Sequence, residues 1–207
     1  MWSIIQAAGW PIWPLIFASV IALALIFERL WSLRQTAVAP PGMVDQVLAE
    51  YKRTGATPEL LAKTAAQGPL GRVLASGLAN IKSPRPVMKE AIEEVGRIVG
   101  HDLERFLTTL GTIAAMSPLL GLFGTVVGMI EIFGSQSAAG SNPIQLAHGI
   151  SVALYNTALG LIVAIPSMIF YRHFRAKVDS LILEMEQQAI KLVELAHGER
   201  IAHGERK

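Results

Sequence analysis

The stretch SPLLGLFGTVVGMI, residues 117–130, is apolar enough to lie in lipid, yet it contains three glycines and one threonine. It forms the second half of an uncharged run, Leu107–Ile130, which is long enough for a membrane-spanning helix of about 20 residues. Small residues within such a helix let another helix approach closely. The stretch therefore predicts a membrane helix with one face adapted to close contact.

Two further uncharged runs flank this one, at 12–27 and 142–171. Trp10 and Trp13 lie where the aromatic belt of a membrane helix is expected. The first run has the length of a signal peptide, but positive charges follow it instead of preceding it. We interpret it as a retained anchor, so the sequence predicts three membrane spans.

The composition fits a chain that lies only partly in the membrane. Hydrophobic residues make up 52% of the 207 residues and charged residues 16%, which suits neither an ordinary soluble domain nor a wholly membrane-embedded one. The chain has no cysteine, and none of its five histidines has a metal-ligand spacing such as HExxH. We expect no metal, no cofactor and no nucleic-acid partner.

The basic residues are distributed on one side of the predicted spans. All 18 Lys and Arg lie in residues 29–105, from the inner end of the first span onward, or in 172–207, whereas the connector GSQSAAGSNP, 134–143, has no charge. The positive-inside rule places the basic segments in the cytoplasm and this connector, with the N-terminus, in the periplasm.

The predicted class is an all-α integral membrane protein with three spans and a small helical cytoplasmic insert. In chain order, we expect a periplasmic N-terminus (1–11), a first span (12–30), a cytoplasmic insert with the start of the second membrane helix (31–106), a second span (107–133), a periplasmic loop (134–148), a third span (149–171) and a cytoplasmic amphipathic helix and tail (172–207).

The predicted C-terminal helix carries an apolar stripe at helical spacing from Val178 to Ala196. A helix of this kind lies on the membrane, folds back on its own subunit, or forms a bundle with neighbouring subunits. The sequence leaves these three alternatives open.

Small and hydroxyl-bearing residues form one face on each of the last two spans. They are Ser117, Gly121, Gly124, Thr125 and Gly128 in the second span, and Ala153, Thr157, Gly160, Ala164 and Ser167 in the third. Close helix packing explains most of these positions.

The two threonines lie at matching depths. Thr125 is eight residues before Phe133, and Thr157 is eight residues after Gly149 in the antiparallel third span. At about 1.5 Å per residue, both hydroxyls lie about 12 Å below the outer surface. The alternative is that each hydroxyl only bonds back to a carbonyl of its own helix.

Carboxylates occur only at the ends of the spans, as Glu28 and Glu131. Ion and proton sites within membranes usually contain Asp, Glu or His. If the protein moves protons, the carboxylate has to come from another chain, and the small-residue face would be the surface that packs against it.

These segments resemble the MotA/TolQ/ExbB proton-channel family, and specifically its TolQ/ExbB branch. The resemblance rests on LLGLFGTVVGMI in the second span, ALYNTALGLIVAIPSMIFY in the third, and GWPIWPLIFASVIALALIFERLWSLR near the start. With the matching topology and span spacing, it covers nearly the whole chain.

The resemblance implies a homopentamer in the bacterial inner membrane, whose second and third helices line a central pore. The pore would enclose a single-span partner similar to ExbD or TolR, with a titrating aspartate in its span. Proton flow through the pore would energise a periplasmic or outer-membrane transport process, with a further partner similar to TonB or TolA.

The resemblance also assigns roles to individual residues. Thr125 and Thr157 match the pore-lining threonines of the family, and Tyr155 and Asn156 are candidates for polar lining, although an Asn also serves as an interhelical contact. One departure is Val152, where several relatives have a glutamate. The positions expected to pack against a partner or neighbour are Gly121, Gly124, Gly128, Gly160 and Pro166.

Three other classes of protein are alternatives to this one. A self-sufficient channel needs its own charged or selective ring, and an intramembrane enzyme needs a motif such as GxSxG; the sequence has neither. We therefore expect no enzyme activity. A scaffold that stabilises its partner without conducting, the choice between proton and sodium, and the machine that is energised stay open.

Overall fold

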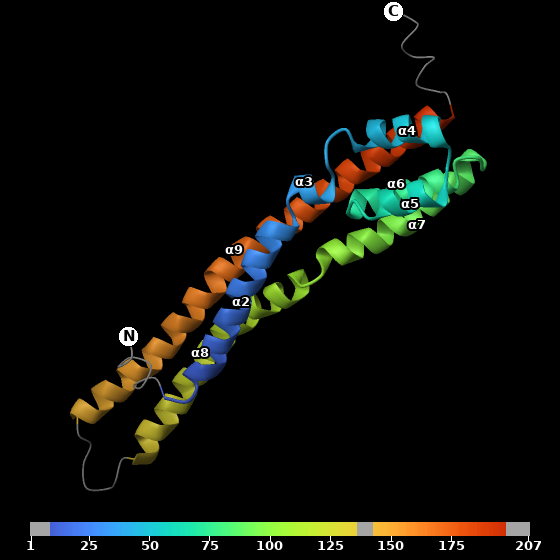
Figure 1. The fold of residues 1–207 in the computed structure, drawn as a ribbon. Coiled ribbons are helices and arrows are strands. Elements are labelled where there is room, and N and C mark those ends of the chain that lie inside the picture. The colour runs from blue at the N-terminus through green and yellow to red at the C-terminus, as the bar shows by residue number, and fades with distance from the viewer. Residues whose placement is uncertain (1–8, 136–142, 198–207) are drawn as a thin grey trace, which may run out of the picture. The chain divides into compact units, whose positions relative to one another are not determined.

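The computed structural model describes residues 9–135 and 143–197, and all of its regular secondary structure in these ranges is helical. The expected all-α class is confirmed. The described residues form two compact units. Unit 1 comprises the chain through Arg29 and residues 106–173, and unit 2 comprises residues 30–105 and the chain from Phe174 onward (Figure 1).

Three helices are long and apolar enough to cross a membrane, as the three uncharged runs predicted. They contain α2 (Ile12–Ser32), α8 (Leu107–Ser135) and the first part of α9 (Pro143–Ala196). The predictions for 1–8, 136–142 and 198–207 lie outside the described residues.

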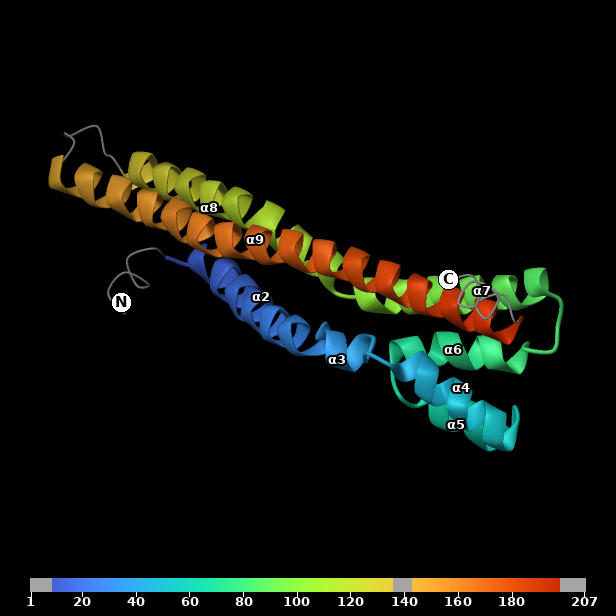
Figure 2. The same cartoon turned by 90° about the horizontal axis from the view of Figure 1, so that it is seen from above.

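In unit 1, α2 contacts α8 near both of its ends. The Trp10 ring meets the Phe123 ring edge-on, with centroids 6.0 Å apart, and the guanidinium of Arg29 lies 5.4 Å from the centroid of Phe106. These two contacts make α2 antiparallel to α8. The helix α8 and the first part of α9 also run antiparallel, side by side in both views (Figures 1 and 2).

Large apolar side chains of unit 1 point away from the rest of the chain. Phe17 is 70% exposed, Phe27 68%, and Ile162 66%. Water would penalise so continuous an apolar surface, whereas lipid or a neighbouring helix matches it. The exposure pattern of unit 1 therefore fits membrane-spanning helices.

Unit 2 has a buried aliphatic core. It contains α3 (Gln35–Val38), α4 (Met43–Thr54), α5 (Pro58–Ala65), α6 (Pro69–Ala79), α7 (Arg85–Glu104) and the second part of α9. Its fully buried residues include Leu70, Leu74, Leu78, Met88, Leu181 and Leu192. The predicted helical insert is thus a packed bundle of short helices with an aliphatic core.

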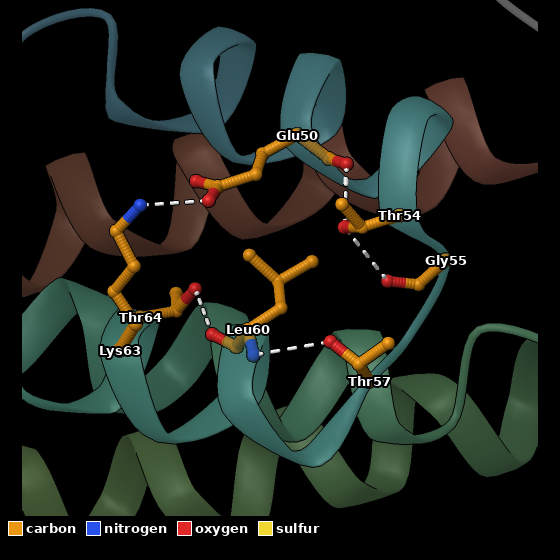
Figure 3. Close-up of polar contacts among 7 residues, drawn as sticks. All are labelled: Glu50, Thr54, Gly55, Thr57, Leu60, Lys63 and Thr64. Atoms are coloured by element: carbon orange, nitrogen blue, oxygen red, sulfur yellow. Dashed lines mark hydrogen bonds and ion pairs between the residues drawn. The ribbon is translucent and has the colours of Figure 1, made fainter.

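Local chemistry fixes the short helices of this bundle (Figure 3). Gly55 ends α4 with a φ of 75°, a left-handed conformation that favours glycine. Thr57 then caps α5, because its hydroxyl oxygen accepts a hydrogen bond of 3.3 Å from the Leu60 N–H. The Lys63 ammonium and the Glu50 carboxylate, 2.7 Å apart, join the two helices at the surface.

The C-terminal stripe packs onto its own subunit. Val178, Leu181, Met185 and Leu192 are each at most 3% exposed within unit 2. Of the three alternatives that the sequence left open, folding back on the same chain accounts for these residues.

The chain breaks its helix between α7 and α8, where the sequence predicted one helix running from the insert into the second span. Phe106 has a φ of 66°, which is unusual for a residue other than glycine. No proline or glycine marks this break, so helical periodicity did not predict it. The Arg29 guanidinium lies against the Phe106 ring at this point.

Candidate ion pathway between α8 and α9

Two glycines allow the backbones of α8 and α9 to touch. A β-carbon added at Gly121 would lie 2.8 Å from the Asn156 carbonyl oxygen, and one added at Gly160 would lie 2.6 Å from the Ser117 carbonyl oxygen. Because both obstacles are backbone atoms, even alanine would force the helices apart. This contact is the tightest part of the predicted small-residue face.

Farther along α8, Gly124 and Gly128 face side chains of α9 instead of its backbone oxygens. A β-carbon at Gly124 would lie 2.7 Å from the β-carbon of Asn156, whereas one at Gly128 would meet Ala153 at an ordinary 3.6 Å. The predicted packing glycines thus pack α8 against α9 of the same chain. Their predicted role toward a partner or a neighbouring subunit stays a prediction.

The two threonines lie within about one helical turn of each other along the helix pair. Gly124, which precedes Thr125, packs on Asn156, which precedes Thr157. Because the helices are antiparallel, Thr125 lies one residue farther out than this contact and Thr157 one residue farther in, so the two differ in depth by about 3 Å. The structure brings the two candidate hydroxyls to neighbouring turns of the two helices.

The hydroxyls differ in their hydrogen bonds. Thr125 Oγ1 donates to the Leu122 carbonyl of its own helix at 2.6 Å, which is the back-bonding that the sequence left as an alternative. Thr157 Oγ1 lies 3.5 Å from the Gly121 carbonyl oxygen of the other helix, a long contact. Both residues are half-buried, so each remains accessible from outside the chain.

A hollow of about 520 Å³ opens beside Thr125 on the outer half of α8. Thr125 provides the one hydroxyl in its lining, and the other residues are Val126, Met129, Ile130, Phe133 and Gly134. Such a surface suits a mostly apolar segment that presents one polar group at the level of Thr125.

The other predicted lining residues are placed differently from one another. Tyr155 is 43% exposed, as a lining residue has to be. Asn156 is 1% exposed, lies against Gly124, and donates from Nδ2 to the Val152 carbonyl at 3.4 Å. Asn156 thus contacts the other helix within the chain, and its role as polar lining of a pore stays a prediction. Pro166 is exposed within α9, between the exposed Ile165 and the buried Ser167.

Ser117 and Ser167 are buried hydroxyl groups of this helix pair. Ser117 Oγ donates to the Ile113 carbonyl and Ser167 Oγ to the Val163 carbonyl, both at 2.7 Å, one turn back on their own helices. Their hydrogen-bonding needs are therefore met locally. They serve the packed face and leave the threonines as the more accessible hydroxyls.

Sequence reasoning missed one close contact of the pair, that of Gly111 with Tyr171. A β-carbon at Gly111 would lie 3.1 Å from the Tyr171 ring, so the ring lies directly on the α8 backbone. Gly111 lies near the start of α8 and Tyr171 lies in α9, so no local sequence pattern links the two residues. Their proximity follows from the antiparallel register alone.

The described parts of the two spans contain no carboxyl or imidazole side chain at the level of the threonines, and Glu131 is exposed near the end of α8. No group of three or more metal-binding residues occurs in the parts of the chain that the structure describes. The helix pair by itself supplies neutral hydroxyls and backbone carbonyls. It does not supply the acid–base group that a proton relay uses.

The fold and this helix pair define a multi-pass membrane protein with a glycine-mediated contact between two of its spans. Residues 65–187 match the model of the MotA/TolQ/ExbB proton channel family. The chain belongs to this family, and its matches to ExbB and TolQ proteins place it in the TolQ/ExbB branch. That family is one of channels and not of enzymes.

Three relatives show how far the similarity extends. An ExbB-like biopolymer transport protein of Synechocystis sp. is 34% identical over 83% of each chain. The biopolymer transport protein exbB1 of Vibrio cholerae is 33% identical over 79% of this chain and 74% of its own. The Tol-Pal system protein TolQ of Pseudomonas aeruginosa is 27% identical over 88% of this chain and 86% of its own.

Proposed function

We propose that this chain is the proton-conducting membrane subunit of a motor that uses the proton-motive force to energise a periplasmic or outer-membrane transport process. The observation that carries the proposal is the pair of accessible threonines within about one turn of each other at the contact of two membrane helices. The names of the similar proteins, biopolymer transport and Tol-Pal system proteins, support the same role.

The chain works with a partner that supplies the missing carboxylate. The described spans have no carboxyl group near the threonines, while the hollow beside Thr125 presents one hydroxyl in an apolar surface. A single-span protein similar to ExbD or TolR, with an aspartate in its span, fits both features. A hydroxyl both donates and accepts hydrogen bonds, so it can contact the aspartate in either protonation state.

Protonation changes the charge of that aspartate and therefore its preferred position among the subunits. Each charge that crosses the membrane supplies about 2.3 kcal/mol per 100 mV. Several copies of the chain around the partner, a homopentamer in the proposal, provide equivalent positions between which it moves. A protein similar to TonB or TolA would transmit the work across the periplasm.

The proposed orientation follows the distribution of basic residues. Unit 2 and the C-terminal tail lie in the cytoplasm, and the connector between α8 and α9 faces the periplasm of a bacterial inner membrane. Cysteines placed singly at Ser83 and at Ser137 test this orientation with a membrane-impermeant thiol reagent on intact cells. We expect labelling at Ser137 alone, and labelling at Ser83 alone would reverse the topology.

The function itself is tested by replacing both threonines with valine, which keeps the shape and β-branching and removes the hydroxyl. We expect Thr125→Val, Thr157→Val to assemble with the partner and to lose about tenfold or more of the proton-dependent activity, because a hydrogen bond to a charged group is worth about 1.5–3 kcal/mol. Thr112→Val is the matched control, since Thr112 Oγ1 also bonds back along α8, at 2.8 Å to the Thr108 carbonyl.

Full activity of the double variant at unchanged expression would mean that the small-residue face of α8 and α9 serves only helix packing. A second measurement, the activity after the proton gradient is collapsed, distinguishes a channel from a scaffold that only stabilises its partner. Its activity would persist after the proton gradient is collapsed while the complex stays assembled.

A further inference from the structure

An exposed aromatic face of α2 ends in a tryptophan that has no part in the proposed ion pathway. Phe17, Phe27 and Trp31 lie on one side of this helix and are 70%, 68% and 71% exposed. Tryptophan is enriched where the acyl chains of a membrane meet the headgroups. The position of Trp31 near the C-terminal end of α2 fits that boundary.

An arginine lies on the ring of this tryptophan. The Cζ atom of Arg34 is 4.2 Å from the centroid of the Trp31 ring, and both residues belong to unit 2. An aromatic face attracts a cation at this distance, so the contact holds the guanidinium beside the exposed ring. A guanidinium over a ring keeps N–H donors for an acceptor such as phosphate. The pair therefore presents an ordered cation next to an exposed aromatic surface.

The charge of Arg34 is not neutralised within the described part of the chain. Arg34 is exposed and forms no ion pair with any residue that the structure describes. Glu28, the closest carboxylate in the sequence, forms its ion pair with Arg29. The carboxylate of Glu184 accepts from the side-chain amide of Gln35, at 2.9 and 3.0 Å. An anion from outside the chain is needed to balance this cation.

We propose that Arg34 and Trp31 form a binding site for the headgroup of an anionic phospholipid. The guanidinium donates hydrogen bonds to the phosphate oxygens, and such charge-assisted bonds are stronger than neutral ones. A zwitterionic lipid also has a phosphate, but its own ammonium group offsets that charge. The net attraction to an unneutralised arginine therefore favours an anionic headgroup.

The order of side chains along α2 matches the order of groups in one leaflet of a membrane. Trp31 lies about 6 Å beyond Phe27 along the helix, at a rise of about 1.5 Å per residue. The apolar face, the tryptophan ring and the arginine follow one another as acyl chains, glycerol region and phosphate do. A soluble anion would use the cation alone and would leave the aromatic ring in water, so this order favours a lipid.

The rival occupant is a carboxylate of another protein chain. Because the side chains of Arg34 and Trp31 are in contact, a protein that binds this arginine also covers the tryptophan. A bound lipid instead brings acyl chains against the Trp31 ring. The two occupants therefore differ in whether lipid reaches this ring.

Fluorescence of Trp31 measures which lipid reaches it. The chain has four tryptophans, and replacing Trp2, Trp10 and Trp13 with Phe leaves Trp31 as the one remaining. The full-length protein is placed in two sets of vesicles of equal parts phosphatidylglycerol and phosphatidylcholine, with bromine near the top of the acyl chains of one lipid only. Since both sets have the same charge, a difference in quenching reports which lipid lies against Trp31. We expect about fivefold stronger quenching by brominated phosphatidylglycerol.

Two controls separate this site from the general charge of the protein. Arg34→Gln should abolish the preference, whereas Arg53→Gln, which removes an equally exposed charge from α4, should leave it unchanged. A chain that retains Trp13 alone should show no preference, because Trp13 is 58% exposed near the other end of α2 and no basic residue precedes Arg29. A preference that persists in Arg34→Gln at unchanged helical circular dichroism would overturn the assignment of the site.

Three other outcomes would also contradict the proposal. Equal quenching by the two lipids would remove the selectivity for an anionic headgroup, and no quenching by either would mean that protein covers Trp31. Inorganic phosphate and sodium chloride, added at equal ionic strength, should reduce the preference by the same small amount. Loss of the preference with phosphate alone would assign the site to a soluble anion.

The outcome is independent of the ion pathway. Quenching needs no proton gradient, and the threonine variants leave both residues of the site in place. A preference for the anionic lipid together with fully active threonine variants would support the lipid site while removing the proposed function.

Discussion

The α8–α9 pair of unit 1 and the bundle of short helices in unit 2 pack their helices through different kinds of contact. Unit 1 brings backbones together at Gly121 and Gly160 and leaves residues such as Leu122 exposed. Unit 2 buries Leu74 and Leu78 completely and keeps its charges at the surface. Moving a leucine from lipid into a helix contact gains little free energy, so the α8–α9 contact depends on close approach of the backbones. Moving a leucine from water into a protein core gains much more.

The largest predicted difference between the two regions comes from shortening a leucine. Leu74→Ala removes a side chain that is 0% exposed, so it should lower the free energy of unfolding by about 2–5 kcal/mol. Leu122→Ala, at 56% exposure in unit 1, should change it by less than about 0.5 kcal/mol. Thermal unfolding of the full chain in detergent, followed by helical circular dichroism, measures both, and equal shifts would break the comparison.

The second prediction enlarges a glycine in the tight part of the α8–α9 contact. Gly160→Ala should cost about 1–3 kcal/mol, because the added carbon meets the Ser117 carbonyl oxygen. Gly128→Ala is the control, since its added carbon meets Ala153 at ordinary contact distance, and it should be nearly neutral. We expect a lower yield of folded protein on a sizing column for Gly160→Ala than for Gly128→Ala. Equal tolerance of both variants would mean that the helices are not in backbone contact.

The smallest effect concerns the polar chemistry that is characteristic of unit 2. Thr57→Ala removes the cap of α5 and should cost about 1 kcal/mol (Figure 3). Thr54→Ala is the matched control, because the Thr54 hydroxyl donates to the Glu50 carbonyl at the exposed end of α4 and caps no helix start. Both shifts are measured by thermal unfolding. A larger loss for Thr54→Ala would contradict the assignment of the cap.

Long-period patterns of the sequence predicted the main features of the fold. Uncharged runs predicted the three spans, because length and hydropathy alone determine whether a helix can cross lipid. Small residues at helical spacing predicted a packed face on the second and third spans, and counting predicted one level for Thr125 and Thr157, which lie within about one turn of each other. These inferences need no knowledge of which elements are neighbours.

Features that depend on tertiary contacts were not predicted from the sequence. The break at Phe106 has no glycine or proline to signal it, and the burial of Asn156 follows from its contact with Gly124 on the other helix. A groove in unit 2 between α7 and the second part of α9 likewise exists only because these two helices lie together. Periodicity identified the stripe on α9 but could not determine which surface covers it.

The most direct test of the central claim is proton uptake by liposomes that contain the chain together with its single-span partner. With a potassium-diffusion potential and a pH-sensitive dye inside, the account predicts uptake by the intact complex. It also predicts a fall of about tenfold or more both in Thr125→Val, Thr157→Val and when the partner's membrane aspartate is changed to asparagine. Uptake at the full rate in both altered complexes would contradict a proton path formed by the two threonines and the partner's carboxylate.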